Sequence, residues 1–430
     1  MKKIVSVSLG DSSLDSHFRT RFLGESFQLS RVGTDGDVKR AVQLIREARE
    51  DADVIGLGRV HEHYTVGTDT FIRPETRKLE KIAGATPVTT GARLREIVQE
   101  WTLRSAQAEL GSIFNNARVL FLSGALNYRL ASVMAEFTDN LSFADPIAQF
   151  GLPNLLHSLG ALELYASGTH PILRFEGGKS VLASVTPMRF LNHMVLRRAV
   201  KDAHVVVAPY EQLEHYGPEE LDGKTIITST VSDSRLEALR EKGVRLVLDC
   251  SIQPFKHTVG LNVVEATIMA ALDKPQDAIS HDDYLEIFTD LELKPRILYP
   301  IPGLKQVNRF AFVIHPLSQQ YLNNLKPLEL VSKVSPRPVM DLVEKAVAYT
   351  PPFVYTKVEG IRSPEGVEAE GWLIIVGGTP REIMSHAPEF TYRRLLAAAD
   401  IAKKLGAQIM GLGAFTKVVG DAGVTVAKRA

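Results

Sequence analysis

The stretch VKRAVQLIREAREDADVIGLG, residues 38–58, decides the fold class of this chain. Its first part places apolar residues three and four positions apart, which is typical of an amphipathic helix. Its last part is a short apolar run ending in Gly-Leu-Gly, which is typical of a buried strand that enters a loop. A helix that leads directly into such a strand is the repeating unit of α/β proteins with a parallel sheet.

A second stretch near the other end of the chain has the same layout. Residues 393–413, RRLLAAADIAKKLGAQIMGLG, again predict an amphipathic helix followed by a strand that ends in Gly-Leu-Gly. The simpler alternative is chance, because helix–strand units are common in α/β proteins. A repeat of this length favours one module used twice. The long segment that follows the first copy has no partner after the second, so we predict that the second module is incomplete.

Other strand-like runs continue the alternation of strands and helices. They are KKIVSVSL (2–9), RVLFLSG (118–124), LSFAD (141–145), AHVVVAP (203–209), KTIITST (224–230) and VRLVLDC (244–250). Asp37 and Asp233 are expected helix N-caps, and Gly243 is an expected helix end. We therefore predict an α/β fold with Rossmann-like, mostly parallel sheets. The expected domains are a front α/β subdomain (1–100), a Rossmann-like domain (101–300) with a helical insertion near 151–200, and a second front α/β domain (301–430).

Composition and charge restrict the partners. The 430 residues include 50 Lys plus Arg and 50 Asp plus Glu, and this zero net charge argues against nucleic acid as the main partner. No apolar run reaches the ~18 residues of a membrane span. The one cysteine excludes an internal disulfide and suits a reducing cytoplasm, which is the compartment we expect. A homo-oligomer remains open.

The turn that follows VLFLSG lies where a dinucleotide-binding fold holds phosphate. We expect Ser123, Gly124 and Asn127 to contact an NAD(P)H cofactor there, and Asp145, after the next strand, to bind a ribose. The turn carries only one of the three glycines of the dinucleotide motif. The alternative is therefore a purely structural Rossmann-like unit.

Candidate catalytic residues are few. Cys250 and His315 each end an apolar strand, where catalytic side chains are often found. The alternatives are a buried structural thiol and an ordinary loop histidine. His61 and His63 flank Glu62, but without a third placed ligand we predict no metal site.

The glycine-rich loop near the end of the chain is the candidate substrate loop. Its glycines would let the backbone approach a substrate closely. The alternative is a simple connection from strand to loop. The residues expected to line the substrate are Gly411, Gly413, Phe415, Thr416, Gly420 and Asp421.

Two parts of the chain resemble known families. Residues 1–295 resemble bacterial proteins described as quinate or shikimate 5-dehydrogenases, through stretches such as VSVSLG (5–10), FADPIAQFGLP (143–153), LDGKTIITSTV (221–231) and GLNVVEA (260–266). Residues 308–430 resemble the N-terminal domain of predicted amino-acid dehydrogenases, a group that includes long-chain acyl-[acyl-carrier-protein] reductase. The stretches that carry the second resemblance are FAFVIHPLS (310–318), VEGIRSPEGVEAEGWLIIVGGTP (358–380) and KKLGAQIMGLGAFTKVVGDAGVTVAKR (403–429).

These resemblances imply an NAD(P)H-dependent oxidoreductase that acts on a small-molecule or acyl substrate. In the second family a Rossmann domain with the nucleotide loop and a catalytic cysteine follows the front domain, so the resemblance implies that this chain is truncated. The single-glycine turn favours the alternative, a non-catalytic Rossmann-like protein that binds a small molecule or scaffolds a partner.

Overall fold

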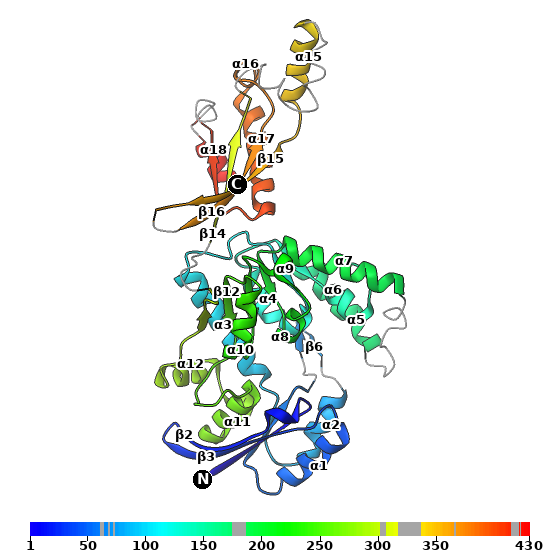
Figure 1. Ribbon diagram of the computed structural model, residues 1–430, viewed down its shortest axis with the longest axis vertical. Coiled ribbons are helices and arrows are strands. Elements are labelled where there is room, and N and C mark those ends of the chain that lie inside the picture. Colours follow the sequence, from blue (N-terminus) through cyan, green and yellow to red (C-terminus); the bar gives the residue numbers. More distant parts are fainter. Residues whose placement is uncertain are drawn as a thin grey trace. The chain divides into compact units, whose positions relative to one another are not determined.

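The chain folds into two compact units (Figure 1). Unit 1 comprises residues 1–112 and 119–302, and unit 2 comprises 113–118 and 303–430. The ranges 1–100 and 101–300, which the sequence predicted as separate parts, belong to the same unit. The computed structural model describes residues 1–60, 64–67, 69–71, 74–173, 186–301, 307–316, 337–364, 367–413, 421 and 423–430.

The first sheet of unit 1 has the strand order β2-β3-β1-β4-β7. Strands β1 (Lys2–Ser8), β3 (Glu25–Gly33), β4 (Val54–Gly58) and β7 (Val88–Thr89) run parallel, and β2 (Ser16–Phe22) pairs with β3 antiparallel. Helix α1 (Val38–Ala48) covers one face, where Ala41 and Ile45 pack with Ile55 and Leu57. Asp37 caps this helix as predicted, because its carboxylate accepts the backbone N–H groups of the first turn.

The second sheet of unit 1 has the order β13-β12-β11-β10-β8-β9. Strands β8 (Val119–Phe121), β9 (Leu141–Phe143), β10 (Val205–Val207), β11 (Thr225–Thr228) and β12 (Leu246–Asp249) are parallel, and β13 (Arg296–Leu298) is antiparallel to β12. In chain order the parallel strands run 2-1-3-4-5, a doubly wound arrangement whose direction of winding reverses between β8 and β10. This confirms the Rossmann-like α/β class.

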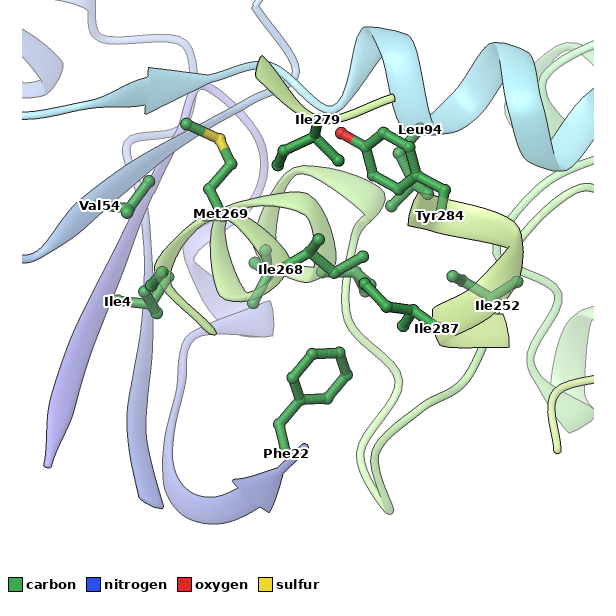
Figure 2. Packing of buried hydrophobic residues seen from close by; sticks show 14 of the residues in the cluster. Ile4, Phe22, Val54, Leu94, Ile252, Ile268, Met269, Ile279, Tyr284 and Ile287 are labelled. Carbon is green, nitrogen blue, oxygen red and sulfur yellow. The ribbon is translucent and has the colours of Figure 1, made fainter. Parts of the chain in front are cut away.

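Helix α11 (Leu261–Leu272) follows the last parallel strand of the second sheet, β12, in sequence but packs on the first sheet. Figure 2 shows Ile268 and Met269 of this helix next to Ile4 and Val54 of the sheet, with Tyr284 on its other side. All these side chains are buried. The helix therefore buries apolar surface on two sides, against the first sheet and against Tyr284 of helix α12 (His281–Asp290).

Unit 2 has one four-stranded sheet with the order β15-β16-β14-β17. Strands β14 (Val307–Ile314), β16 (Glu368–Ile375) and β17 (Ile409–Leu412) are parallel, and β15 (Phe353–Arg362) forms an antiparallel hairpin with β16. Helix α17 (Pro388–Leu405) covers one face, where Leu395 and Ala398 pack with Val313 and Ile374.

The two modules share one topology, as the repeat predicted. Replacing β1, β2, β3, α1 and β4 by β14, β15, β16, α17 and β17 converts one order into the other, with every strand direction kept. The register also matches, because Gly56 pairs with Ser6 of β1 and Gly411 pairs with Phe312 of β14. Among the described residues of unit 2, no strand corresponds to β7.

The sequence analysis did not predict the hairpin β2–β3 or the strand β13. It was also one residue off at α10 (Asp233–Glu241), where the N-cap is Ser232 instead of Asp233. The helical insertion contains α6 (Leu159–Leu173) and α7 (Thr186–Asp202). Among the described residues, no helix is both long and apolar enough to cross a membrane. The other elements of the described residues are β5 (Tyr64–Val66), β6 (Asp69–Phe71), α2 (Pro74–Ile82), α3 (Ala92–Glu109), α4 (Tyr128–Met134), α5 (Asp145–Phe150), α8 (Tyr210–Leu213), α9 (Pro218–Leu221), α12 (His281–Asp290), α15 (Arg337–Ala348), α16 (Pro380–Met384), α18 (Val424–Arg429) and the 3₁₀ turns Ser12–Leu14, Ala125–Asn127 and Gln276–Ala278.

Candidate functional site

The expected phosphate turn, Ser123–Asn127, follows β8 at the point where the winding of the sheet reverses. Ligands of doubly wound sheets bind outside the carboxyl ends of the strands at this point. The position of the turn therefore agrees with the dinucleotide prediction, and the partners of its backbone N–H groups decide whether it can hold a phosphate.

A carboxylate of the protein itself occupies those donors. Asp145 accepts the backbone N–H of Gly124 at 2.7 Å through Oδ2 and that of Ala125 at 3.0 Å through Oδ1. Asp145 is only 1% exposed. Burial raises the pKa of Asp145, and the hydrogen bonds from the two backbone N–H groups oppose that rise. This side chain thus closes the turn instead of presenting its carboxylate to a ribose.

The rest of the turn is also closed by neighbouring side chains. Asn127 donates to the Ser123 carbonyl at 2.8 Å and accepts from Gln99 at 3.0 Å. A Cβ at Gly124 would lie 2.3 Å from the Phe143 ring and 3.1 Å from Leu162 of α6. As they are placed here, these residues do not fit a pyrophosphate, because its donors are taken and its space is filled.

The two candidate catalytic residues have different surroundings. Cys250 follows β12 and is buried, and this burial raises the pKa of its thiol far above the ordinary value. A thiol held neutral is a poor nucleophile, so these surroundings favour the buried structural alternative for Cys250. His315 follows β14 and lies 3.2 Å from the Pro316 carbonyl through Nδ1.

The expected substrate loop is described only in part. Phe415, Thr416 and Gly420 lie outside the described residues, as do His61, Glu62 and His63. The Asp421 carboxylate accepts the hydroxyl and backbone N–H of Thr425 at 2.5 and 3.0 Å, and these bonds lower its pKa.

The two glycines at the start of this loop have different neighbours. A Cβ at Gly411 would lie 2.5 Å from the Phe312 ring, and one at Gly413 would lie 3.0 Å from the Val313 carbonyl. Both neighbours belong to β14, so these glycines pack against the adjacent strand.

A different group of charged side chains joins the carboxyl ends of the two sheets of unit 1. Arg59 directly follows β4, Glu211 lies on α8 after β10, and Arg235 lies on α10 after β11. The Glu211 Oε1 atom accepts from Arg59 at 2.6 Å and from Arg235 at 3.0 Å. We call these three residues the arginine cluster. Because the arginine cluster contains two guanidinium groups and one carboxylate, it carries a net charge of one positive.

The arginine cluster is held in place by its surroundings. Arg235 also donates to the Thr230 carbonyl at 3.1 Å, and its guanidinium lies 4.5 Å from the centre of the Tyr210 ring. Partial burial raises the pKa of Glu211, but its own backbone N–H and the charges of both arginines outweigh that effect, so its pKa stays below the ordinary value. The carboxylate therefore stays ionised at neutral pH.

The backbone of Arg59 has a left-handed conformation with φ of 47°. This conformation costs about 1–2 kcal/mol for a residue with a side chain. The Arg59 side chain also passes close to Gly10 after β1, because a Cβ at Gly10 would lie 2.9 Å from the Arg59 Cδ. Unfavourable backbone conformations tend to occur where a side chain has a function.

Sequence reasoning missed the arginine cluster, although all three residues follow strands. The rule that functional side chains stand at carboxyl ends of strands would have included them. The sequence does not show that the end of β4 meets the end of β10. Among the described residues, no group of three His, Cys, Asp or Glu side chains could hold a metal ion.

Comparison with known proteins places family boundaries on unit 1. Residues 3–90 match DUF8753 and residues 93–300 match DUF8754, each described as a domain of unknown function. The boundary between the two families falls at the turn between β7 and α3. No curated protein matches the chain.

Several solved structures resemble part of the chain. The malic enzyme of Entamoeba histolytica is 13% identical with a TM-score of 0.32, over 65% of this chain and 60% of its own. A Mycobacterium smegmatis structure in complex with β-D-fucofuranose is 12% identical with a TM-score of 0.25, over 70% of this chain and 99% of its own. A substrate-binding protein of a sugar ABC transport system from Bordetella parapertussis is 12% identical with a TM-score of 0.27, over 64% of this chain and 82% of its own. Similarity this low does not bear on the function of this chain.

Proposed function

We propose that unit 1 binds a small anionic molecule, with a carboxylate or phosphate group, at the arginine cluster. The observation that carries the proposal is the shared Glu211 oxygen, which holds guanidinium groups from both sheets at the carboxyl ends of their strands. Guanidinium groups bind carboxylates and phosphates through paired, charge-assisted hydrogen bonds.

Exposure of the cluster supports the same proposal. The side chains of Arg59 and Glu211 are 57% and 43% exposed, and that of Arg235 is 27% exposed. An ion pair with this much solvent contact stabilises a fold only slightly. The unfavourable backbone at Arg59 is therefore better explained by a role in ligand binding than by a gain in stability.

The test is a titration of the full chain with simple anions. The probes are inorganic phosphate, succinate, quinate and shikimate, the last two because of the resemblance of residues 1–295. We expect saturable heat in isothermal titration calorimetry for at least one probe, and a loss of affinity of about 10–100-fold in both Arg59→Ala and Arg235→Ala, since each removes a charged hydrogen bond.

Arg240→Ala is the matched control. Arg240 lies on the same helix as Arg235, but its side chain pairs with Glu237 at the surface. We expect unchanged affinity in this variant. The proposal is overturned if no probe binds, or if all three variants weaken binding equally.

The second candidate is the NAD(P)H-dependent oxidoreductase. The strand order and the position of Asp145, 21 residues after Gly124 at the end of the next strand, favour it. It requires Asp145 to release the turn when the cofactor binds. Titration with NADH and NADPH tests it by energy transfer from protein to nicotinamide fluorescence. If the wild type gives no signal, this candidate fails for the described site, whatever the result for the anion probes.

A further inference from the structure

The arginine cluster already contains an anionic group, the carboxylate of Glu211. The Nη2 atoms of Arg59 and Arg235 donate to the same oxygen of that carboxylate, Oε1, at 2.6 and 3.0 Å. A carboxylate or phosphate of a ligand seeks charge-assisted hydrogen bonds from the same kind of N–H group. Glu211 therefore occupies the position in which an incoming anionic group would interact with both arginines at once.

Both arginines have anchors besides the shared carboxylate. Arg235 donates through its other terminal nitrogen, Nη1, to the Thr230 carbonyl at 3.1 Å, and its guanidinium lies 4.5 Å from the centre of the Tyr210 ring. The Arg59 side chain lies against Gly10, because a Cβ on that glycine would be 2.9 Å from the Arg59 Cδ. These contacts do not involve the carboxylate, so they persist when the carboxylate moves away.

The Glu211 side chain can leave the two arginines at little cost in stability. It is 43% exposed and belongs to α8, a helix of one turn. Ion pairs with this much solvent contact contribute little to the free energy of folding. Both of its hydrogen bonds to the arginines also end on one oxygen, whereas a ligand group with two or three oxygens can give each guanidinium its own acceptor.

We propose that Glu211 is an internal competitor of the ligand, and that the ligand's carboxylate or phosphate displaces the Glu211 carboxylate from Arg59 and Arg235. This inference rests on the proposed function, since it concerns the same site. In the free chain Glu211 keeps the two guanidinium groups paired. The apparent affinity for a ligand is then reduced to the fraction of molecules in which this contact is open.

Calorimetric titration of the full chain and its Glu211 variants tests the displacement. The probes are again inorganic phosphate, succinate, quinate and shikimate. We expect the anion that binds the wild type to bind Glu211→Ala about 3–30-fold more tightly, because two exposed ion pairs no longer have to break. Glu211→Gln keeps the size of the side chain without its charge, and it should also bind the anion more tightly than the wild type.

Glu214→Ala is the matched control for net charge. Glu214 lies three residues further along the chain, is exposed, and accepts a hydrogen bond from Lys242 through its backbone carbonyl. Its replacement changes the charge of the protein by the same amount but leaves the arginine cluster complete. We expect this variant to bind the anion like the wild type. Circular dichroism of each variant verifies folding.

The outcomes separate this inference from the proposed function. If Glu211→Ala binds the anion as weakly as the wild type or more weakly, the displacement is overturned while anion binding stands, because Glu211 would then not compete with the ligand. An equal gain in Glu211→Ala and Glu214→Ala also overturns it, since net charge would explain the gain. If no anion binds either the wild type or Glu211→Ala, the proposed function fails, and the displacement fails with it.

Discussion

At the scale of single residues, Asp145 decides what the turn after β8 can do. A helix N-terminus or glycine turn attracts anions because its backbone N–H groups lack partners. In this chain the partner is the carboxylate of Asp145, at the start of α5 after the next strand, at 2.7 and 3.0 Å. The protein thereby satisfies two buried donors that would otherwise be costly to leave without hydrogen bonds.

Replacement of Asp145 should therefore reduce stability. We expect Asp145→Ala to lower the free energy of unfolding by about 1–3 kcal/mol, because it leaves the Gly124 and Ala125 N–H groups buried without an acceptor. Asp145→Asn keeps one acceptor oxygen and should lose less. Urea unfolding measures both. Asp139→Ala at an exposed position is the control, and equal losses in Asp139→Ala and Asp145→Ala would contradict this role.

Burial of Cys250 predicts its reactivity. The thiol has a strongly raised pKa and is 3% exposed, so the folded chain at pH 8 should not react with Ellman's reagent over the time of the assay. One thiol per chain should react in 6 M guanidinium chloride. Rapid reaction of the folded chain would show that the thiol is accessible after all.

At the scale of elements, the start of α11 lies very close to the turn that precedes α3. A Cβ at Gly91, before α3, would lie 2.5 Å from the Asn262 backbone nitrogen, and Gly91 has φ of 80°. Only glycine combines this conformation with so close an approach. The first sheet, α3 and α11 therefore meet at one point that has no space for a side chain.

A pair of glycine substitutions separates backbone strain from steric contact. Gly84 has φ of 68° and no atom within 4 Å of its Cβ position. Gly84→Ala should lower the free energy of unfolding by about 1–2 kcal/mol, because alanine strains the left-handed backbone there. Gly91→Ala should cost about 1–3 kcal/mol more, because α11 must also move. Chemical denaturation measures the free energy of unfolding of both variants. Equal losses would mean that α11 moves away from a side chain at residue 91 without a cost in stability.

At the scale of the whole molecule, one module has been used twice in different surroundings. In unit 1 its two faces are covered by α1 and α11, whereas in unit 2 α17 covers one face and the described residues place no helix over the other. The buried carboxylate of Glu265 locks α11 in place. It accepts the Leu94 N–H at 3.0 Å, the Tyr284 hydroxyl at 2.8 Å and the Gln276 amide at 3.0 Å.

Two compact units should unfold in two steps, and Glu265 can identify one of them. We expect Glu265→Ala to lower the free energy of unfolding of unit 1 by about 3 kcal/mol or more, because several buried donors lose their acceptor. In calorimetry the transition of unit 1 should therefore move to a lower temperature. The transition of unit 2 should not move. Glu237→Ala, at an exposed pair, should change neither transition. A common shift of both transitions would show that the units unfold together.

The sequence by itself determined the alternation of strands and helices, the apolar strands that were predicted, and the repeat. These features depend on local periodicity and on glycine positions, which each segment carries in its own residues. The hairpin β2–β3 was missed because polar residues such as Ser16, Arg19 and Arg21 occupy its edge strand. Strand β13 was missed because it is short and surrounded by prolines.

Only the tertiary structure decided which side chains meet. Whether Asp145 faces a ribose or the turn beside it depends on the packing of α6 and Phe143 around Gly124. The arginine cluster requires the end of β4 to meet the end of β10, which are about 150 residues apart. Contacts of that kind come from tertiary packing between distant segments, and the spacing of residues along the chain carries no record of that packing.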